Sequence, residues 1–339
     1  MQQALYHPKH GYYSSGRCAI GRRGDYFTNV SVGPLFGRLL TAQFVEMWER
    51  LGETGNFIIV EQGAHHGEFA QDVLESARKF YPDFFAALRY RIVEPFPILQ
   101  DRQSQTLAEF GGRIEWRPSI DALEPFVGVH FSNELLDSMP VRLISHGKEK
   151  LVDLEGDRFV FVERLLPQGA AASRLPRDEE SSFNEAALDW IDHVASKLRH
   201  GYILAVDYGH LRNKVDTTIQ VRAQHRYLDS PFDQIGYADI TMHVNWRSVA
   251  RRACANGLHL IGFTDQHHFL TGIISEPGGD DWGQSPKMKR ELQTLLYPEM
   301  LGRAFQVLAL ARKVNASTQR LAGFKFAQEP RSGLEPVIE

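Results

Sequence analysis

The chain has 339 residues, 43% of them hydrophobic and 24% charged, which suits a folded globular protein with a sizeable core. Its 38 lysines and arginines nearly balance 42 aspartates and glutamates, and the net charge of −4 excludes a general electrostatic attraction to nucleic acid or to an anionic membrane. The two cysteines, Cys18 and Cys254, are far apart and lack a C-x-x-C partner, which argues against a disulfide framework or a zinc site and favours a reducing cytoplasm.

Residues 1–55 predict a helical segment that covers the rest of the protein. They open on MQQALYHP, a helical pattern with no cap before it, as expected if a natural N-terminal segment is missing. Farther along, Phe36, Leu40, Phe44 and Leu51 recur at helical spacing and predict a helix with one face in the core. The start carries no signal-peptide pattern, and no apolar run reaches the roughly 18 residues of a membrane span, so we expect neither export nor membrane insertion.

Strand and helix patterns alternate through residues 56–140. The strands are continuous apolar runs rather than alternating ones, which favours a parallel sheet with helices on both faces. In chain order, the predicted elements are a strand at 56–63, a helix at 67–80, a strand at 90–95, a helix at 98–110, a strand at 113–116 and a strand that opens 128–140.

The stretch 141–200 interrupts this rhythm. Apolar and polar residues alternate from Val141 to Leu165, with glycine turns between them, and predict an antiparallel hairpin. The polar residues 166–182 predict a surface loop, and 182–198 predict a helix. We therefore expect an insertion at this point of the sheet.

Residues 201–315 predict the second half of the sheet, followed by a tail at 316–339. A buried strand at 201–210 opens this half. The segment 211–245 has few apolar runs and predicts an irregular excursion over the edge or mouth of the sheet, on the side of the reaction partner. The apolar stretches at 259–273 and 304–313 predict a closing pair of strands, with a helix around 287–298 between them.

Polar residues stand where predicted strands end, which is where open parallel sheets bind ligands. Gly63 and Gly67 allow a sharp turn close to a ligand, and the following helix points free N–H groups toward it. Glu94 could accept hydrogen bonds from ribose hydroxyls, although it follows Glu61 by 33 residues rather than by about 20. The polar strand ends are Glu61, Glu94, Ser132 to Glu134 and Asp207 to Gly209.

Each of these features also has a purely structural interpretation. The glycines could serve packing alone, and Glu94 could be a solvated strand end. Together they predict a site for a nucleoside cofactor. The pairs His65-His66 and His267-His268 do not predict a metal site, because neighbouring side chains diverge and neither pair has an i,i+4 partner or a nearby carboxylate motif.

The order and spacing of several motifs resemble one known family. These motifs include HPKHGYY, GDYFTNVSVGPLFGRLL, VEQGAHHGEFAQDVL, RIVEPFPILQDRQ, SNELLDSMPV, AVDYG, GYADITMHVNW, QHHFLTGI and RAFQVLALAR. Over essentially its whole length the chain resembles the MidA-type S-adenosylmethionine-dependent methyltransferases, whose mitochondrial members assist assembly of respiratory complex I by methylating arginine. The resemblance implies an α/β fold: a class I methyltransferase, Rossmann-like, mostly parallel seven-stranded sheet with helices on both faces and inserted segments.

The resemblance also implies roles for individual residues toward S-adenosylmethionine. The family's usual loop L-G-P-G-R-G is altered here, because Gln62, Ala64 and His65 replace its leucine, proline and middle glycine. His65 either narrows the cofactor pocket or points outward if its φ is negative. The implied cofactor-binding residues are Glu61, Gly63, Gly67, Glu94 and Asn133, with Gly24, Phe27 and Thr28 in a segment that covers the site; the catalytic candidates are Glu134, Asp137 and Asp25.

For Asp137, a cap on the turn before Pro140 is an alternative to catalysis. A methyl transfer of this kind needs alignment of donor and acceptor, exclusion of water and, for an arginine acceptor, a carboxylate that orients the guanidinium and accepts a proton.

Three functional hypotheses follow. The first is a protein-directed methyltransferase, which the resemblance favours. The second is a non-catalytic assembly or binding factor whose cofactor loop is degenerate at His65. The third is a nicotinamide-dependent oxidoreductase, against which stand the Asn133-Glu134 motif and the lack of a second glycine-rich unit. We expect a protein substrate, with a respiratory-chain subunit as one candidate, and neither nucleic acid nor a resident metal. The expected location is the bacterial cytoplasm or the mitochondrial matrix, and the oligomeric state stays open.

Overall fold

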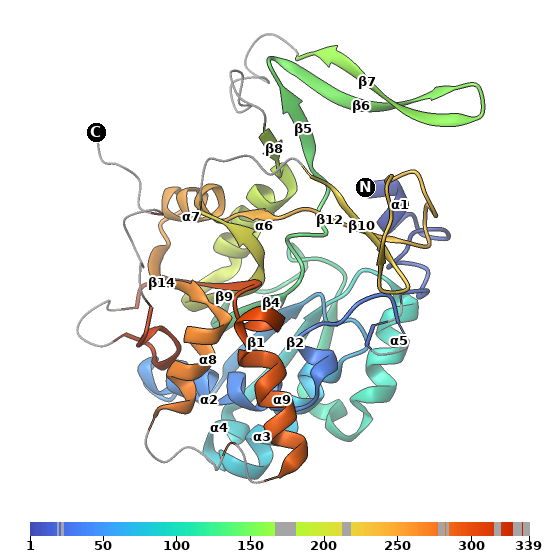
Figure 1. Ribbon diagram of the computed structural model, residues 1–339. Helices are drawn as coiled ribbons and strands as arrows, with labels where there is room; N and C mark the ends of the chain where they lie inside the picture. Colours follow the sequence, from blue (N-terminus) through green and yellow to red (C-terminus); the bar gives the residue numbers. More distant parts are fainter. Residues whose placement is uncertain are drawn as a thin grey trace.

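The computed structural model describes residues 1–18, 20–21, 24–166, 181–211, 218–276, 282, 285–314, 320–327 and 334 (Figure 1). Its helices are α1 (Gln2–Tyr6), α2 (Leu35–Arg50), α3 (Glu68–Phe80), α4 (Pro82–Ala87), α5 (Pro97–Thr106), α6 (Glu185–Lys197), α7 (Trp246–Ala255), α8 (Gln266–Ile274) and α9 (Pro286–Leu296), with short turns η1 (Val30–Val32), η2 (Ala108–Arg113), η4 (Pro298–Gly302) and η5 (Ala322–Phe324). The strands are β1 (Phe57–Gln62), β2 (Leu88–Val93), β3 (Ile114–Arg117), β4 (Phe126–Asn133), β5 (Arg142–Ser145), β6 (Lys148–Glu155), β7 (Arg158–Leu165), β8 (Ser181–Phe183), β9 (Leu198–His210), β10 (Gln220–Ala223), β11 (Arg226–Tyr227), β12 (Asp239–Thr241), β13 (Val244–Asn245), β14 (His259–Asp265) and β15 (Phe305–Arg312).

The central sheet has the strand order β14-β15-β9-β4-β1-β2-β3. The pairs from β3 through β9 are all parallel, whereas β15 runs antiparallel to both β9 and β14. The two residues of β13 extend the sheet beside the end of β9. This mostly parallel sheet of seven strands with one reversed strand is the class I methyltransferase arrangement, so the predicted fold is confirmed.

Helices cover both faces because successive strand residues point to opposite sides. In β1, Ile59 packs into the core beneath α2, α3 and α8, while Ile58 and Val60 pack into the core beneath α6 and α7. Phe36 and Phe44 of α2 are buried, which confirms the predicted helical stripe. Among the described helices, none has the length and apolar character that crossing a membrane requires.

The predicted hairpin is also confirmed. Strands β6 and β7 pair antiparallel over their whole length and belong to a separate four-stranded sheet in the order β7-β6-β5-β8. Figure 1 shows this hairpin projecting from the body of the protein. The predicted surface loop at 166–182 falls mainly on 167–180, which lie outside the described residues.

The excursion at 211–245 is more regular than predicted. Strands β10, β11 and β12 form a small antiparallel sheet that packs against the N-terminal segment, next to α1 in Figure 1. Val221 and Ile240 share a separate core there with Leu5 and Tyr12. Single apolar residues between polar ones carried little signal by themselves, because their apolar partners lie more than two hundred positions earlier in the chain.

Two predictions near the C-terminal end are corrected. The stretch 259–273 is a strand only as far as Asp265, whose side chain accepts the N–H of His268 and so caps α8. Helix α7 was not predicted, although Asn245 caps it in the same way by accepting the N–H of Ser248. In both cases a capping residue directly precedes the helix.

Candidate active site

The loop after β1 keeps a glycine-like shape despite its histidine. Gly63 and Gly67 have φ of 84° and 89°, and His65 has φ of 48°. The negative φ that would let His65 point outward is therefore not observed. That conformation costs a residue with a side chain roughly 1–2 kcal/mol. It is held by the His65 carbonyl, which accepts the Gln103 Nε2 donor at 3.0 Å, and by stacking of the ring on His66 at 3.7 Å.

A carboxylate does lie beside this histidine pair, contrary to the expectation from sequence. Ligand atoms of His65, His66 and Glu68 lie within 4.8 Å of one another. However, Arg102 Nη1 is 2.9 Å from His66 Nε2, and its positive charge opposes a second cation. Burial, followed by the neighbouring His65, lowers the pKa of His66 to about 4, so the ring is neutral at pH 7 and accepts this hydrogen bond.

Two buried carboxyl groups lie at the ends of β1 and β2. Glu61 accepts the Tyr90 hydroxyl at 2.7 Å, and burial raises its pKa to about 8. Glu94 accepts the Phe96 N–H and Gln103 Nε2, each at 3.0 Å, and burial raises its pKa to about 7. Because only 4% of Glu94 is exposed, the alternative of a solvated strand end is wrong.

The end of β4 leads into a tightly bonded turn. Asn133 accepts a hydrogen bond from Asn29 Nδ2 at 3.0 Å and donates one to Glu134 Oε1 at 2.9 Å. Glu134 itself is left-handed, with φ of 53°, and its N–H donates to the Val206 carbonyl. Burial, and then the charge of Asp207, raise the pKa of Glu134 to about 8. The backbone strain at Glu134 is thus offset by its hydrogen bonds to Asn133 and Val206.

Asp207, at the end of β9, holds this turn in place. Its Oδ2 accepts three successive N–H groups, from Leu135 at 3.1 Å, Leu136 at 2.8 Å and Asp137 at 3.2 Å, and its Oδ1 accepts the Tyr208 N–H at 2.7 Å. The DYG strand end marked Asp207 as polar, but no local pattern indicated that it bonds a turn seventy positions earlier.

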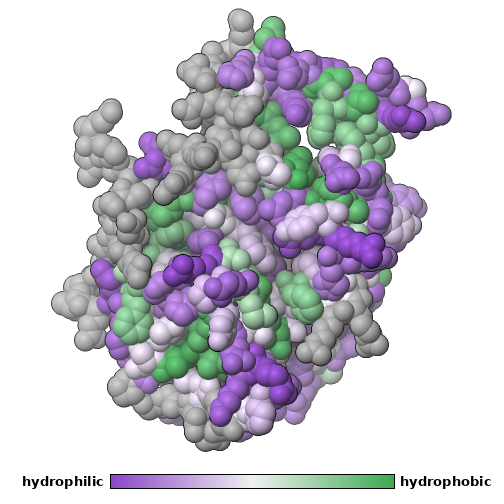
Figure 2. Space-filling view, viewed as in Figure 1, coloured by the Kyte–Doolittle hydropathy of each residue, from purple (hydrophilic) through white to green (hydrophobic). Residues whose placement is uncertain are grey.

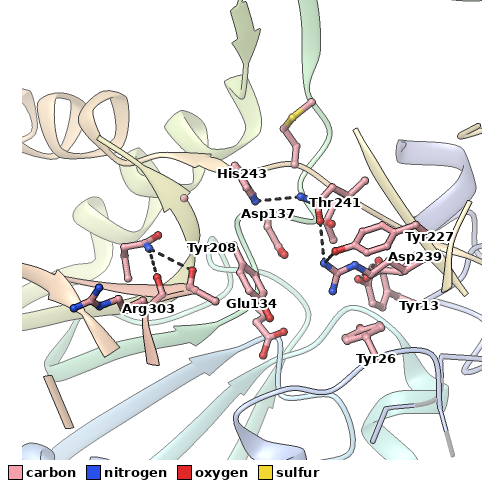
Figure 3. A pocket seen from close by; sticks show the side chains of 16 residues that line it. Tyr13, Tyr26, Glu134, Asp137, Tyr208, Tyr227, Asp239, Thr241, His243 and Arg303 are labelled. Atoms are coloured by element: carbon pink, nitrogen blue, oxygen red, sulfur yellow. Dashed lines mark hydrogen bonds between the residues drawn. The ribbon is translucent and has the colours of Figure 1, made fainter. Parts of the chain in front are cut away.

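Beside the turn lies a cavity of about 420 Å³ at the carboxyl end of the sheet (Figure 3). Three carboxyl groups and four tyrosines face it, and the Tyr13 hydroxyl donates to Asp239 at 2.5 Å. Burial raises the pKa of Asp239 to about 6 and that of Asp137 well above its usual value. The lining residues are Tyr13, Tyr26, Glu134, Asp137, Tyr208, Gly209, Gln220, Arg222, Tyr227, Asp239, Thr241, Met242, His243, Arg303, Ala304 and Gln306.

The fold brings two of the three catalytic candidates into this cavity. Glu134 and Asp137 line it, whereas Asp25 is not among its described lining residues. Asp25 instead accepts the Tyr12 hydroxyl at 2.7 Å and the Gln224 N–H at 2.8 Å, which ties the N-terminal segment to β10 and its turn. The cavity residues to which sequence reasoning assigned no individual role include Tyr13, Tyr26, Tyr208, Arg222, Tyr227 and Asp239. Four of these lie within motifs that carried the resemblance (HPKHGYY, GDYFT, AVDYG and GYADIT), whereas Arg222 and Tyr227 lie outside them.

The predicted cover segment 24–28 lies next to the β4 turn, and its Tyr26 is part of the cavity wall. Thr28 is buried and exchanges hydrogen bonds with Ser31, while Asn29 bonds Asn133. Phe27 is exposed, with its ring 4.9 Å from that of His225. Gly24 donates its N–H to the Gly21 carbonyl.

The buried carboxyl groups predict a stability that falls with rising pH. Folding raises the pKa values of Glu61, Glu94, Glu134 and Asp239 above their ordinary values near 4, so the folded state binds more protons than the unfolded one between about pH 4 and pH 8. This contribution is complete below pH 4 and is lost as pH rises through 6 to 8. We expect Tm, measured by calorimetry without ligand, to fall from about pH 5 to pH 8. A flat or rising Tm over this range would contradict the assignment of neutral buried carboxyls.

The sheet order, the glycine-type loop and the acidic strand ends define a class I methyltransferase. Comparison of the sequence extends this from the fold to the family: the model of S-adenosyl-L-methionine-dependent methyltransferases matches residues 39–264, and the chain belongs to that family. The protein is therefore an S-adenosylmethionine-dependent methyltransferase, and the hypothesis of a nicotinamide-dependent oxidoreductase is set aside.

Several similar proteins match this chain over most of its length. A crystal structure of a COG1565 superfamily member from Burkholderia thailandensis, bound to S-adenosyl-homocysteine, is 26% identical, with a TM-score of 0.81 over 98% of this chain and 90% of that one. The mitochondrial protein arginine methyltransferase NDUFAF7 homolog of Drosophila melanogaster is 28% identical over 81% of this chain and 70% of its own. The Homo sapiens protein arginine methyltransferase NDUFAF7 is 25% identical over 98% of this chain and 82% of its own.

Proposed function

We propose that the methyl acceptor is an arginine side chain of a protein. The observation that carries this proposal is the cavity beside Glu134, where three carboxyl groups and four tyrosines gather. A guanidinium has five N–H donors and no acceptor, so it needs several oxygen acceptors at once, and aromatic faces attract its charge. The similar proteins named as protein arginine methyltransferases support the same acceptor.

The loop after β1 and the end of β2 offer hydrogen-bonding groups that suit a nucleoside cofactor. Glu94 is a buried carboxyl group at a strand end, and α3 begins directly after the left-handed loop with no side-chain cap on its first N–H groups. Bound S-adenosylmethionine supplies a methyl group on a sulfonium. We assign its binding to Glu61, Gly63, Gly67, Glu94 and Asn133, covered by Gly24, Phe27 and Thr28, with no metal.

For the acceptor, Glu134 and Asp137 orient the guanidinium, and Glu134 accepts the proton that nitrogen loses on methylation. An arginine side chain is fully protonated at neutral pH, so a carboxylate in contact with it is needed as the new bond forms. Tyr208 and Asp239 complete the wall of the same cavity. Asp25 contributes by holding the N-terminal segment against β10 and its turn.

The acceptor is tested with methyl-labelled S-adenosylmethionine and soluble proteins of a cell lysate, followed by mass spectrometry. The expected product is methylarginine in one or a few proteins, and none with heat-denatured enzyme. Label found only on small molecules, or on a residue other than arginine, would overturn the proposal.

The alternative of a binding factor without catalysis is favoured by His65 alone. We expect calorimetric titration to detect S-adenosylmethionine binding by the natural protein, because His65 already adopts the glycine conformation and its ring stacks on His66 instead of standing free. His65→Gly is expected to bind the cofactor about equally well, since the left-handed strain at His65 is already present without cofactor and cancels in the affinity. Binding by the variant alone would support the binding factor.

We further propose a respiratory-chain subunit as the acceptor, in the mitochondrial matrix of a eukaryote or the cytoplasm of a bacterium. The similar proteins carry the word mitochondrial in their names, which supports the first compartment. Mass spectrometry of respiratory complexes from cells without this enzyme is expected to show loss of one methylarginine.

A further inference from the structure

The projecting hairpin carries an unusual apolar surface. Val152 pairs with Phe161 and Leu154 with Phe159 across β6 and β7, which puts all four side chains on one face. Their exposed fractions are 55%, 37%, 61% and 46%, and Figure 2 shows an apolar region over the hairpin. These four residues are called the hairpin patch below. A contiguous apolar patch on a protruding element commonly marks an interaction site.

The hairpin also offers a free strand edge. β7 stands at the end of its sheet, so one side of its backbone has no strand neighbour among the described residues. It is eight residues long and holds no proline, which is the usual block against a further strand. An extended polypeptide can therefore pair with β7 through backbone hydrogen bonds and rest its own apolar side chains on the hairpin patch.

Two strands of the hairpin sheet, β7 and β5, connect it to the cavity beside Glu134. Phe159 and Phe161 contact Phe232, with ring centroids 6.0 Å and 4.9 Å apart, and Phe232 belongs to the excursion whose β10 and β12 line the cavity. On the other side, β5 begins at Arg142, shortly after Asp137 in the cavity wall. A chain lying along the hairpin is thus directed toward the carboxyl groups.

We propose that the hairpin is the docking platform for the protein acceptor, which adds an extended segment to β7 and covers the hairpin patch while its arginine enters the cavity. This inference rests on the proposed protein substrate. The hairpin is connected to the cavity that the acceptor arginine would enter. This connection favours the acceptor as the occupant of the hairpin patch over a second copy of this chain, which would not need to reach the cavity.

The test compares methylation of lysate proteins with methylation of a short arginine peptide, using a patch variant and a control variant. Leu154→Ser with Phe159→Ser removes one cross-strand pair of the patch, and Val160→Ser changes the opposite face of the same strand as a matched control. With tritiated S-adenosylmethionine, methylation of lysate proteins by the patch variant is expected to fall about tenfold or more, the size of effect typical of an interface hot spot. Methylation of a short synthetic arginine peptide, and cofactor binding by calorimetry, are expected to match the natural protein.

Other outcomes overturn the inference in distinguishable ways. An equal loss with peptide and protein would mean that the patch acts on the fold or the cavity. An unchanged rate with lysate proteins, together with a dimer in sedimentation that only the patch variant loses, would assign the patch to a second copy. If the natural protein labels the peptide or small molecules but no protein, the proposed protein substrate fails and this inference fails with it.

Discussion

Replacing Glu134 by glutamine is expected to lower kcat for methyl transfer by about 10²- to 10⁴-fold, the usual contribution of a positioned acid or base. The amide keeps the size of the side chain but cannot take the proton that the acceptor nitrogen loses. The substitution replaces one carboxyl oxygen by an NH₂ group, and Asn133 can still donate its hydrogen bond to the remaining oxygen. The Kd for S-adenosylmethionine is therefore expected to change much less than kcat.

The pH dependence gives this prediction a second readout. Burial raises the pKa of Glu134 in the free enzyme to about 8, and only the ionised carboxylate accepts a proton, so kcat/KM of the natural enzyme is expected to rise with pH up to about pH 8 and then level. Glu134→Gln is expected to lose this step. Asp25→Asn serves as control: because Asp25 bonds Tyr12 and Gln224, a smaller loss with an unchanged midpoint is expected. A Glu134→Gln enzyme with more than a tenth of natural kcat would rule out this role.

Asp207→Asn is expected to reduce the free energy of unfolding by about 2–4 kcal/mol, because an unpaired buried N–H costs about 1–3 kcal/mol. The carboxylate accepts four N–H groups in total. The asparagine amide has one acceptor oxygen and one NH₂ group. Its NH₂ group therefore faces either the three N–H groups of the turn or the N–H group of Tyr208, which are also donors. Relief of repulsion with Glu134 and Asp137 offsets only part of this loss, since burial already keeps both of those carboxyls largely protonated at neutral pH.

Urea denaturation with and without the substitution measures this effect. The matched control is Asp265→Asn, since Asp265 also accepts a backbone N–H, that of His268, as a helix cap at which asparagine substitutes with little loss. Because Asp207 bonds the turn that carries Glu134 and Asp137, kcat is expected to fall as well. Equal stability of the natural protein and the Asp207 variant would contradict the role of Asp207 as the support of this turn.

Local patterns were sufficient for most of the sheet. The apolar runs of β1, β4 and β9 and the helical stripe of α2 follow from side-chain periodicity, which depends on neighbours within a few positions. The helices α7 and α8 were missed although a capping residue directly precedes each. Two other features depend on contacts beyond that range of a few positions. The small sheet of β10–β12 exists because it packs on the N-terminal segment, and the histidine loop keeps φ of 48° at His65 because Gln103 and His66 hold it.

The sequence by itself therefore determined the order of the strands β1 to β4, the glycine loop and the acidic residues that end β1, β2 and β4, because these depend on local periodicity and on residue types at strand ends. Only the tertiary structure decided the composition of the acceptor cavity. Tyr13 and Asp239 are 226 positions apart, and Asp207 bonds a turn 70 positions away. Such pairs meet only when the whole sheet and both inserted segments have folded, since no local periodicity encodes which distant side chains share a cavity.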